Sequence, residues 1–198
     1  MKFNKFFIIL LFFNLSFANT NSFSIEPDVF VQSTVNRASN VLSKKISKIE
    51  KINELKNIAK ETVDIEGIGF YTLGNYRKDM SKDELSKYAT LFEQYFLKSF
   101  SSRLAEYTNP EISVNSKEVL SENYTIVNSV LKGTSDRPEV KIDWRIYTKN
   151  PNNPYIRDLI IEGLSLARTQ REEFASIINS NNGDFEVLFK TLEEFIKN

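Results

Sequence analysis

The chain has 198 residues, with 26 basic and 26 acidic side chains, and it contains neither histidine nor cysteine. Without histidine, Ser-His-Asp and Cys-His catalytic groups are excluded, and without both residues a zinc site of the usual kind is excluded. The sequence has no P-loop and no G-x-G-x-x-G motif, and its balanced charge argues against nucleic-acid binding. We therefore expect no metal, no cofactor and no nucleic-acid partner.

The first 18 residues have the features of a secretory signal peptide. Two lysines precede an unbroken apolar run over 6–13, and small residues follow at Ser16 and Ala18. The apolar run is shorter than the roughly 20 residues that span a bilayer, which favours a cleaved leader over an uncleaved anchor. We expect cleavage near Ala18, export to the periplasm and one mature domain over residues 19–198 with a net charge near −2.

Apolar residues recur at helical spacing through the first half of the mature chain. A first helix is predicted from Pro27 and a second over 52–62, and a third is predicted behind Asp64 with glycines at its start and end. The clearest helix follows Ser81, which forms a capping box with Glu84. It is rich in aromatic residues and extends about 27 residues toward Pro110.

After Pro110 the apolar period changes from helical to two, which is typical of strands. Strands are predicted from Ile112, over 124–131, over 140–147 and over 155–161, joined by short turns, and two helices follow over 164–180 and 184–196. Short connections favour an antiparallel meander. The sequence therefore predicts an α+β fold in which helices pack on one side of a four-stranded antiparallel sheet, with an apolar space between them. That space could equally be an ordinary packed core.

Three segments carry a resemblance to a known family. They are FYTLGNYR over 70–77, FEQYF over 92–96 with its continuation to Tyr107, and DLIIEGLSLARTQREEF over 158–174. In this order the segments resemble the MlaC family, whose members are also named toluene-tolerance or ABC-transporter auxiliary proteins. The chain departs from the family pattern before Asp158, where the usual Trp-x-x-Tyr is missing and Asn and Pro replace a glycine-rich turn.

The resemblance implies a cystatin/NTF2-like α+β domain that holds phospholipid acyl chains between the sheet and the helices. It implies a carrier, not an enzyme, that shuttles phospholipid between an inner-membrane MCE-domain ABC transporter complex and an outer-membrane lipoprotein–porin complex. Such a carrier maintains the lipid asymmetry of the outer membrane, and a monomer fits this role.

The candidate lipid-binding residues are the apolar side chains of the long helix and the sheet that are expected to point inward. They are Phe70, Leu73, Phe92, Phe96, Phe100, Val130, Ile142, Trp144, Ile146 and Ile161. This set depends on the phase of each strand, because a shift of one residue exchanges its two faces. Arg168 and Arg171 are candidates for contact with a headgroup or a partner, although both could belong to an ordinary helix surface.

Two other classes of function remain open at this stage. NTF2-like pockets can host isomerases or dehydratases, and here Asp143 or Asp158 could act as a base beside Tyr88 or Tyr95. That hypothesis requires a buried carboxylate that points into the cavity. The third possibility is an interaction protein whose core is fully packed and holds no ligand.

Overall fold

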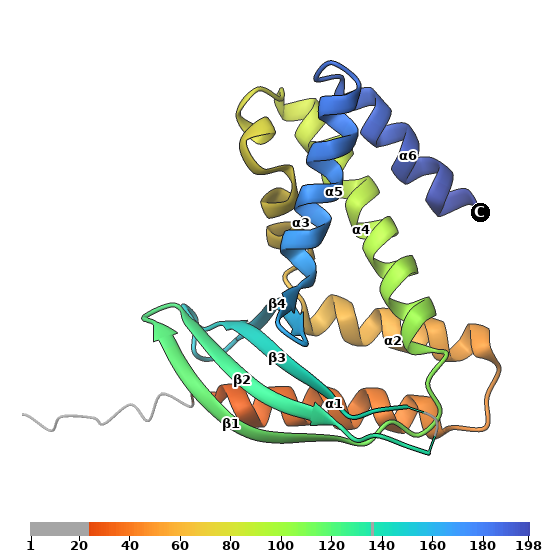
Figure 1. Ribbon diagram of the computed structural model, residues 1–198, viewed down its shortest axis with the longest axis vertical. Helices are drawn as coiled ribbons and strands as arrows, with labels where there is room; N and C mark the ends of the chain where they lie inside the picture. Colours follow the sequence, from red (N-terminus) through yellow and green to blue (C-terminus); the bar gives the residue numbers. More distant parts are fainter. Residues whose placement is uncertain (1–23, 136) are drawn as a thin grey trace, which may run out of the picture.

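The computed structural model describes residues 24–135 and 137–198, and within these ranges it contains six α-helices, one 3-10 helix and five strands. The predicted signal peptide over 1–18 lies outside the described residues. The architecture is the mixed α+β fold that the sequence predicts, with helices gathered on an antiparallel sheet (Figure 1). None of the helices in the described ranges has both the length and the hydrophobicity needed to span a membrane.

The helices begin where polar side chains cap them. Ser47 and Ser81 each form a capping box with the glutamate three residues later, and Asp64 accepts a hydrogen bond from the amide of Gly67. Such caps bond amides that have no partner within the helix. The helical segments are α1 (Pro27–Ser43), α2 (Lys48–Thr62), α3 (Ile65–Leu73), the 3-10 helix η1 (Gly74–Lys78), α4 (Lys82–Leu104), α5 (Leu166–Ser180) and α6 (Phe185–Lys197).

Two helix boundaries differ from the sequence-based expectation. Helix α2 begins at Lys48 rather than near residue 52, because the Ser47 capping box fixes an earlier start. Helix α4 has 23 residues rather than about 27. Its end at Leu104 allows Tyr107, after the helix, to pack against a small apolar cluster formed by α1 and α2.

The strands form one antiparallel meander with the order β1-β2-β3-β4-β5. Their bounds are β1 (Ile112–Ser121), β2 (Tyr124–Leu131), β3 (Val140–Tyr147), β4 (Tyr155–Ile161) and β5 (Leu164–Ser165). The short β5 was not predicted from the sequence. Glu162 and Gly163 both have positive φ, at 50° and 83°, and this two-residue turn folds Leu164 back beside Ile161. Helix α5 therefore starts only at Leu166.

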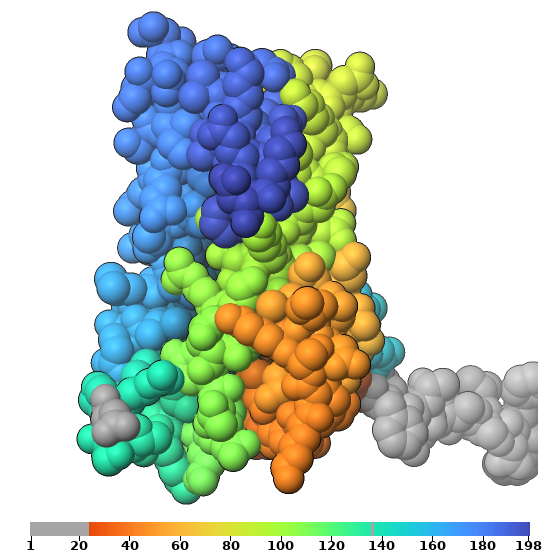
Figure 2. Space-filling view, turned by 90° about the vertical axis from the view of Figure 1, so that its right-hand side faces the viewer, coloured from red at the N-terminus to blue at the C-terminus, as the bar shows by residue number. Residues whose placement is uncertain are grey.

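The helices occupy two regions of the molecule. Helix α1 lies along the sheet and contacts β1 and β2, while α3, α4 and α5 stand above the sheet and α6 packs against α4 and α5 away from it (Figure 1). Helix α6 covers the surface between α4 and α5 (Figure 2). Because α4 also contacts α2, it joins the upright helices to the layer that packs on the sheet.

Aromatic rings fill the core between α3, α4, α5 and α6. Tyr88 is fully buried, and its ring lies 5.8 to 6.4 Å from those of Phe92, Phe174 and Phe189. A Cβ atom on Gly69 would lie only 2.8 Å from the Phe92 ring. The glycine therefore lets α3 approach α4 closely.

Tyr88→Phe is expected to make the protein less sensitive to alkaline pH. Burial raises the pKa of Tyr88, whereas an unfolded tyrosine ionises near pH 10. The folded state thus favours the protonated phenol, and its stability is fully present below about pH 10 and lost above it, by about 1.4 kcal/mol per pH unit. The variant should lose about 1 kcal/mol at neutral pH, since Tyr88 donates a 2.7 Å hydrogen bond to Thr72. Urea unfolding between pH 7 and 11 measures both effects. If the free energy of unfolding changes with pH equally in the variant and the wild type, Tyr88 does not cause the alkaline loss of stability.

Candidate functional site

An apolar cavity of about 300 Å³ lies between the sheet and helices α1 and α2, and we call it the sheet cavity. Its helical wall includes Val35, Ala38 and Leu42 of α1 and Leu55 of α2. On the opposite side its lining side chains come from β2, β3 and β4, at Leu131, Ile142, Trp144, Leu159 and Ile161. Branched and aromatic side chains at these positions leave an apolar space rather than a closed core.

A second cavity of about 270 Å³ lies between α4 and α5, and we call it the helix cavity. Phe92, Phe96 and Phe100 follow one another along α4 and form its aromatic wall. The rings of Phe96 and Phe100 are stacked with centroids 5.5 Å apart, and those of Phe92 and Phe96 are 6.2 Å apart. Spacing of four residues places these rings on one side of the helix.

The two cavities adjoin each other and have seven lining residues in common. The shared residues are Val63, Phe100, Arg103, Trp144, Ile156, Leu159 and Leu166. Two of them reach the surface, since Arg103 is exposed and Leu166 is 45% exposed. The junction between the cavities is therefore apolar inside and carries a cation at its outer edge.

Polar side chains form one edge of the helix cavity. The Tyr95 hydroxyl donates a 2.8 Å hydrogen bond to Gln170, and the Gln170 amide donates to Glu173 at 2.9 Å. Burial raises the pKa of Tyr95, and the nearby Glu173 carboxylate raises it further. These groups are already bonded to one another. Arg103, by contrast, forms no ion pair within the part of the chain that the structure describes.

Most of the predicted pocket residues lie near these cavities, but they do not all line them. Of the predicted residues, the helix cavity is lined by Phe92, Phe96, Phe100 and Trp144. The sheet cavity is lined by Phe100, Ile142, Trp144 and Ile161. Leu73 and Ile146 are buried in the core and contribute to neither lining, and Phe70 packs beneath the Arg77 guanidinium at 5.4 Å.

The prediction for Val130 placed it on the wrong face of the sheet. In β2 the residue opposite Trp144 is Val127, whereas Val130 lies opposite the exposed Lys141. The inward positions of β2 include Ser129, a polar residue that receives a 2.8 Å hydrogen bond from the Trp144 indole and donates to a backbone carbonyl. Because both hydrogen bonds satisfy its hydroxyl, Ser129 can face the interior. The apolar side chains of β2 had instead favoured the face that carries Val130.

Neither arginine proposed as a headgroup contact lines the two cavities. Arg168 is exposed on α5, and Arg171 lies over the Tyr71 ring at 5.2 Å, where it joins α5 to α3. Sequence reasoning missed the contribution of α1 and α2 to the lining, and it gave Arg103 no role. The helical spacing of Val35, Ala38 and Leu42 was the only available signal for the former.

The sheet separates Asp143 from the tyrosines proposed for an enzyme site, but it does not separate Asp158 from Tyr95. Asp143 accepts a hydrogen bond from Asn128 on the face away from Trp144, while Tyr88 is bonded to Thr72 within the helices. Asp158 does reach the helix cavity together with Tyr95. Both of its oxygens, however, accept hydrogen bonds from the start of α5, from the Ser165 hydroxyl and the Ala167 amide. Asp158 therefore holds the start of α5 against β4 through these two hydrogen bonds.

Comparison with known proteins identifies the family. Residues 32–194 match the MlaC protein family. The chain belongs to this family. A curated MlaC relative, the intermembrane phospholipid transport system binding protein of Haemophilus influenzae, is 24% identical over 194 residues, which cover 93% of this chain and 90% of the relative.

A solved structure matches this MlaC-family chain over most of its length. It is the phospholipid-binding protein from Ralstonia solanacearum in complex with a phospholipid, and the two folds agree with a TM-score of 0.73. The match covers 87% of this chain and 98% of the other, at 17% sequence identity. At this identity the likeness establishes the shared fold.

Proposed function

We propose that this protein is a phospholipid carrier that holds acyl chains in the sheet and helix cavities. The observation that carries the proposal is the pair of adjoining apolar cavities with a common wall at Phe100, Trp144 and Leu159. Together their volumes fall within the range of about 300–1,000 Å³ that is typical of small-ligand sites. The name of the Haemophilus relative and the ligand of the Ralstonia protein support the same assignment.

The physical chemistry of lipids explains why such a carrier is needed. Each CH₂ group that enters water costs about 0.8 kcal/mol, so the two chains of an ordinary phospholipid cost on the order of 20 kcal/mol to desorb. A protein that buries both chains removes most of this cost. It needs no catalytic group and no nucleotide site for the lipid itself, and any input of energy comes from a partner.

The branched shape of a phospholipid fits the arrangement of the cavities. We place one acyl chain in each cavity, so that the chains diverge around the shared wall and the headgroup stays at the surface beside Arg103. The guanidinium would donate hydrogen bonds to the phosphate, a pairing that is stronger than one between neutral groups. Arg168 is then a proposed contact for a partner rather than for the headgroup.

Native mass spectrometry of the mature protein from an expression host, followed by lipid extraction, tests this proposal. We expect an added mass that corresponds to about one phospholipid per protein. Arg103→Glu should lower the fraction of protein that carries an anionic phospholipid, because it reverses the charge beside the phosphate. Arg77→Glu on η1 is the matched control. A mass without lipid that persists after incubation with phospholipid vesicles would contradict the proposal.

We also propose where the carrier acts and with which partners. It would work in the periplasm, receiving or delivering lipid at an inner-membrane MCE-domain ABC transporter complex and at an outer-membrane lipoprotein–porin complex. The relative's role in intermembrane phospholipid transport supports this pathway and a contribution to outer-membrane lipid asymmetry. Lipid transfer to each purified complex, measured separately, tests the two steps, and failure at either complex would remove that partner.

A further inference from the structure

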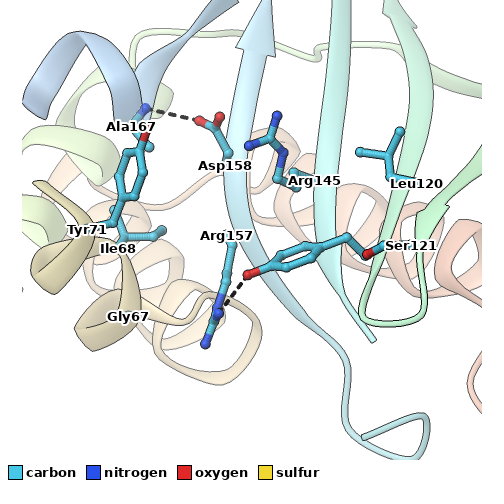
Figure 3. Close-up of a pocket in the computed structure, with 10 residues that line it drawn as sticks. Gly67, Ile68, Tyr71, Leu120, Ser121, Arg145, Arg157, Asp158 and Ala167 are labelled. Atoms are coloured by element: carbon cyan, nitrogen blue, oxygen red, sulfur yellow. Dashed lines mark hydrogen bonds between the residues drawn. The ribbon is translucent and has the colours of Figure 1, made fainter. Parts of the chain in front are cut away.

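A third pocket, larger than either apolar cavity, lies between α3 and the other face of the sheet. Its volume is about 420 Å³, and we call it the arginine pocket. Its lining residues are Gly67, Ile68, Tyr71, Leu120, Ser121, Tyr124, Arg145, Arg157, Asp158 and Ala167. Figure 3 shows Tyr71 and Ile68 of α3 across the pocket from Arg145, with Leu120 and Ser121 of β1 beyond it.

The strand register separates this pocket from the sheet cavity. Successive side chains of a strand point to opposite faces, so Arg145 lies on the face away from Trp144. Arg145 stands opposite Ile126 of β2 and Asp158 of β4, whereas Trp144 stands opposite Val127 and Leu159. The arginine pocket is thus a separate site, although Ile68, Asp158 and Ala167 also line the helix cavity.

Arg145 is a partly buried cation that forms no ion pair within the described residues. Its Nε atom is buried and has no hydrogen-bond partner there. A buried charge is normally paired, because desolvation of an unpaired ion is costly. The terminal nitrogens of Arg145 are therefore suited to receive an anion from the pocket.

The neighbouring carboxylates are engaged elsewhere. Asp158 lies beside Arg145 on the next strand, and Figure 3 shows its hydrogen bond of 3.0 Å from the Ala167 amide. Its other oxygen accepts a 2.6 Å hydrogen bond from the Ser165 hydroxyl. Asp64 pairs with Arg157, whose Nε lies 2.6 Å from Oδ2. Arg157 also donates to the Tyr124 hydroxyl at 2.8 Å. Asp158 therefore keeps its negative charge near Arg145, but its oxygens are already hydrogen-bonded, whereas the Arg145 Nε has no hydrogen-bond partner.

One side of the pocket is largely apolar and partly exposed. Tyr71 is 41% exposed and Leu120 is 48% exposed, and Ile68 lies between Tyr71 and the sheet side of the pocket. The guanidinium of Arg171 lies over the Tyr71 ring and adds a second positive charge near this side. A ligand with an anionic end and a short apolar part would pair the cation and cover these side chains.

We propose that the arginine pocket binds an oxyanion, a phosphate or a carboxylate, through Arg145 on the face of the sheet opposite the sheet cavity. The anion could be free or could belong to an amphiphile whose apolar part covers Tyr71 and Leu120. This site does not depend on the lipid carrier function, because Arg145 lines neither of the cavities that we assign to acyl chains.

Calorimetric titration of the mature protein with inorganic phosphate and, separately, with octyl phosphate tests the site. Arg145→Gln is expected to weaken binding about tenfold or more, since it removes charge-assisted hydrogen bonds. Arg145→Lys should give an intermediate loss, because it keeps the charge without the planar fork. Arg77→Gln on η1 is the matched control and should bind as the wild type does.

The two probes identify the source of the anion. Binding of both probes with equal dependence on Arg145 indicates a free oxyanion, and binding of octyl phosphate alone indicates an amphiphile. If neither probe binds, or if Arg145→Gln binds as the wild type does, the proposal is wrong. If Ala38→Trp abolishes the binding of octyl phosphate and Arg145→Gln does not, the probe occupies the sheet cavity and the proposal is also wrong. Urea unfolding verifies that Arg145→Gln is folded, and removal of an unpaired cation should not lower its stability.

Discussion

Ala38→Trp is expected to abolish phospholipid binding while the protein remains folded. Ala38 is the smallest side chain of α1 in the lining of the sheet cavity, and a tryptophan at this position would fill the space that we assign to an acyl chain. The indole would enter an existing cavity rather than a close-packed core, so we expect a change in unfolding free energy of no more than about 1 kcal/mol. Lipid that copurifies with the protein should fall at least about tenfold, a ratio that corresponds to 1.4 kcal/mol.

Two matched variants separate blockage from a general effect of tryptophan. Asn40→Trp places the same side chain at an exposed position of α1 and should retain lipid. Ser99→Trp enters the helix cavity instead and tests whether both cavities are needed. Quantitative lipid extraction and native mass spectrometry give the occupancy of each variant. Full lipid occupancy in Ala38→Trp would exclude the sheet cavity as an acyl-chain site.

Phe92→Ala is expected to cause the largest loss of stability among single substitutions in α4. Phe92 is 2% exposed, and its ring lies within 6.3 Å of those of Tyr88, Tyr95, Phe96 and Phe174. Truncation of such a ring removes buried apolar area and leaves a cavity, which together cost about 3–5 kcal/mol. The free energy of unfolding in urea measures this loss, provided that the denaturant slope of the variant matches that of the wild type.

Phe195→Ala provides the control for Phe92→Ala. Phe195 also contacts Tyr95, with ring centroids 4.9 Å apart, but it is 42% exposed on α6. We expect its truncation to cost less than about 1.5 kcal/mol, because much of its surface is already in water. Similar losses in the two variants would show that the Phe92 ring is not central to the packing of α4.

Capping and periodicity allowed several elements to be predicted from the sequence. Ser81 and Glu84 form the expected capping box, and Asp64 caps α3. The alternation of Ile142, Trp144 and Ile146 with polar neighbours correctly placed the inner face of β3. These features depend on contacts between residues close in sequence, and such contacts can be recognised without the tertiary structure.

The phase of β2 could not be recognised in the same way. Ile126 and Val130 are as apolar as Val127, so the local pattern does not decide which face of the strand points inward. The register with β3 decides it, because it sets Ser129 against Ile142 and brings its hydroxyl to the Trp144 indole. The prediction of Val130 as a pocket residue failed for this reason.

The sequence by itself determined the α+β class, most of the helix starts, the order of the strands and the resemblance to the MlaC family. The tertiary structure decided which of the many apolar residues line a space and which fill the core. Ile146 and Trp144 both alternate with polar neighbours in the sequence, but of the two only Trp144 lines the sheet and helix cavities. It also decided that Arg103 lies at the junction of the cavities and that the buried Nε of Arg145 has no hydrogen-bond partner. Cavities and unpaired charges arise from the distances between elements far apart in the chain, and local spacing does not fix those distances.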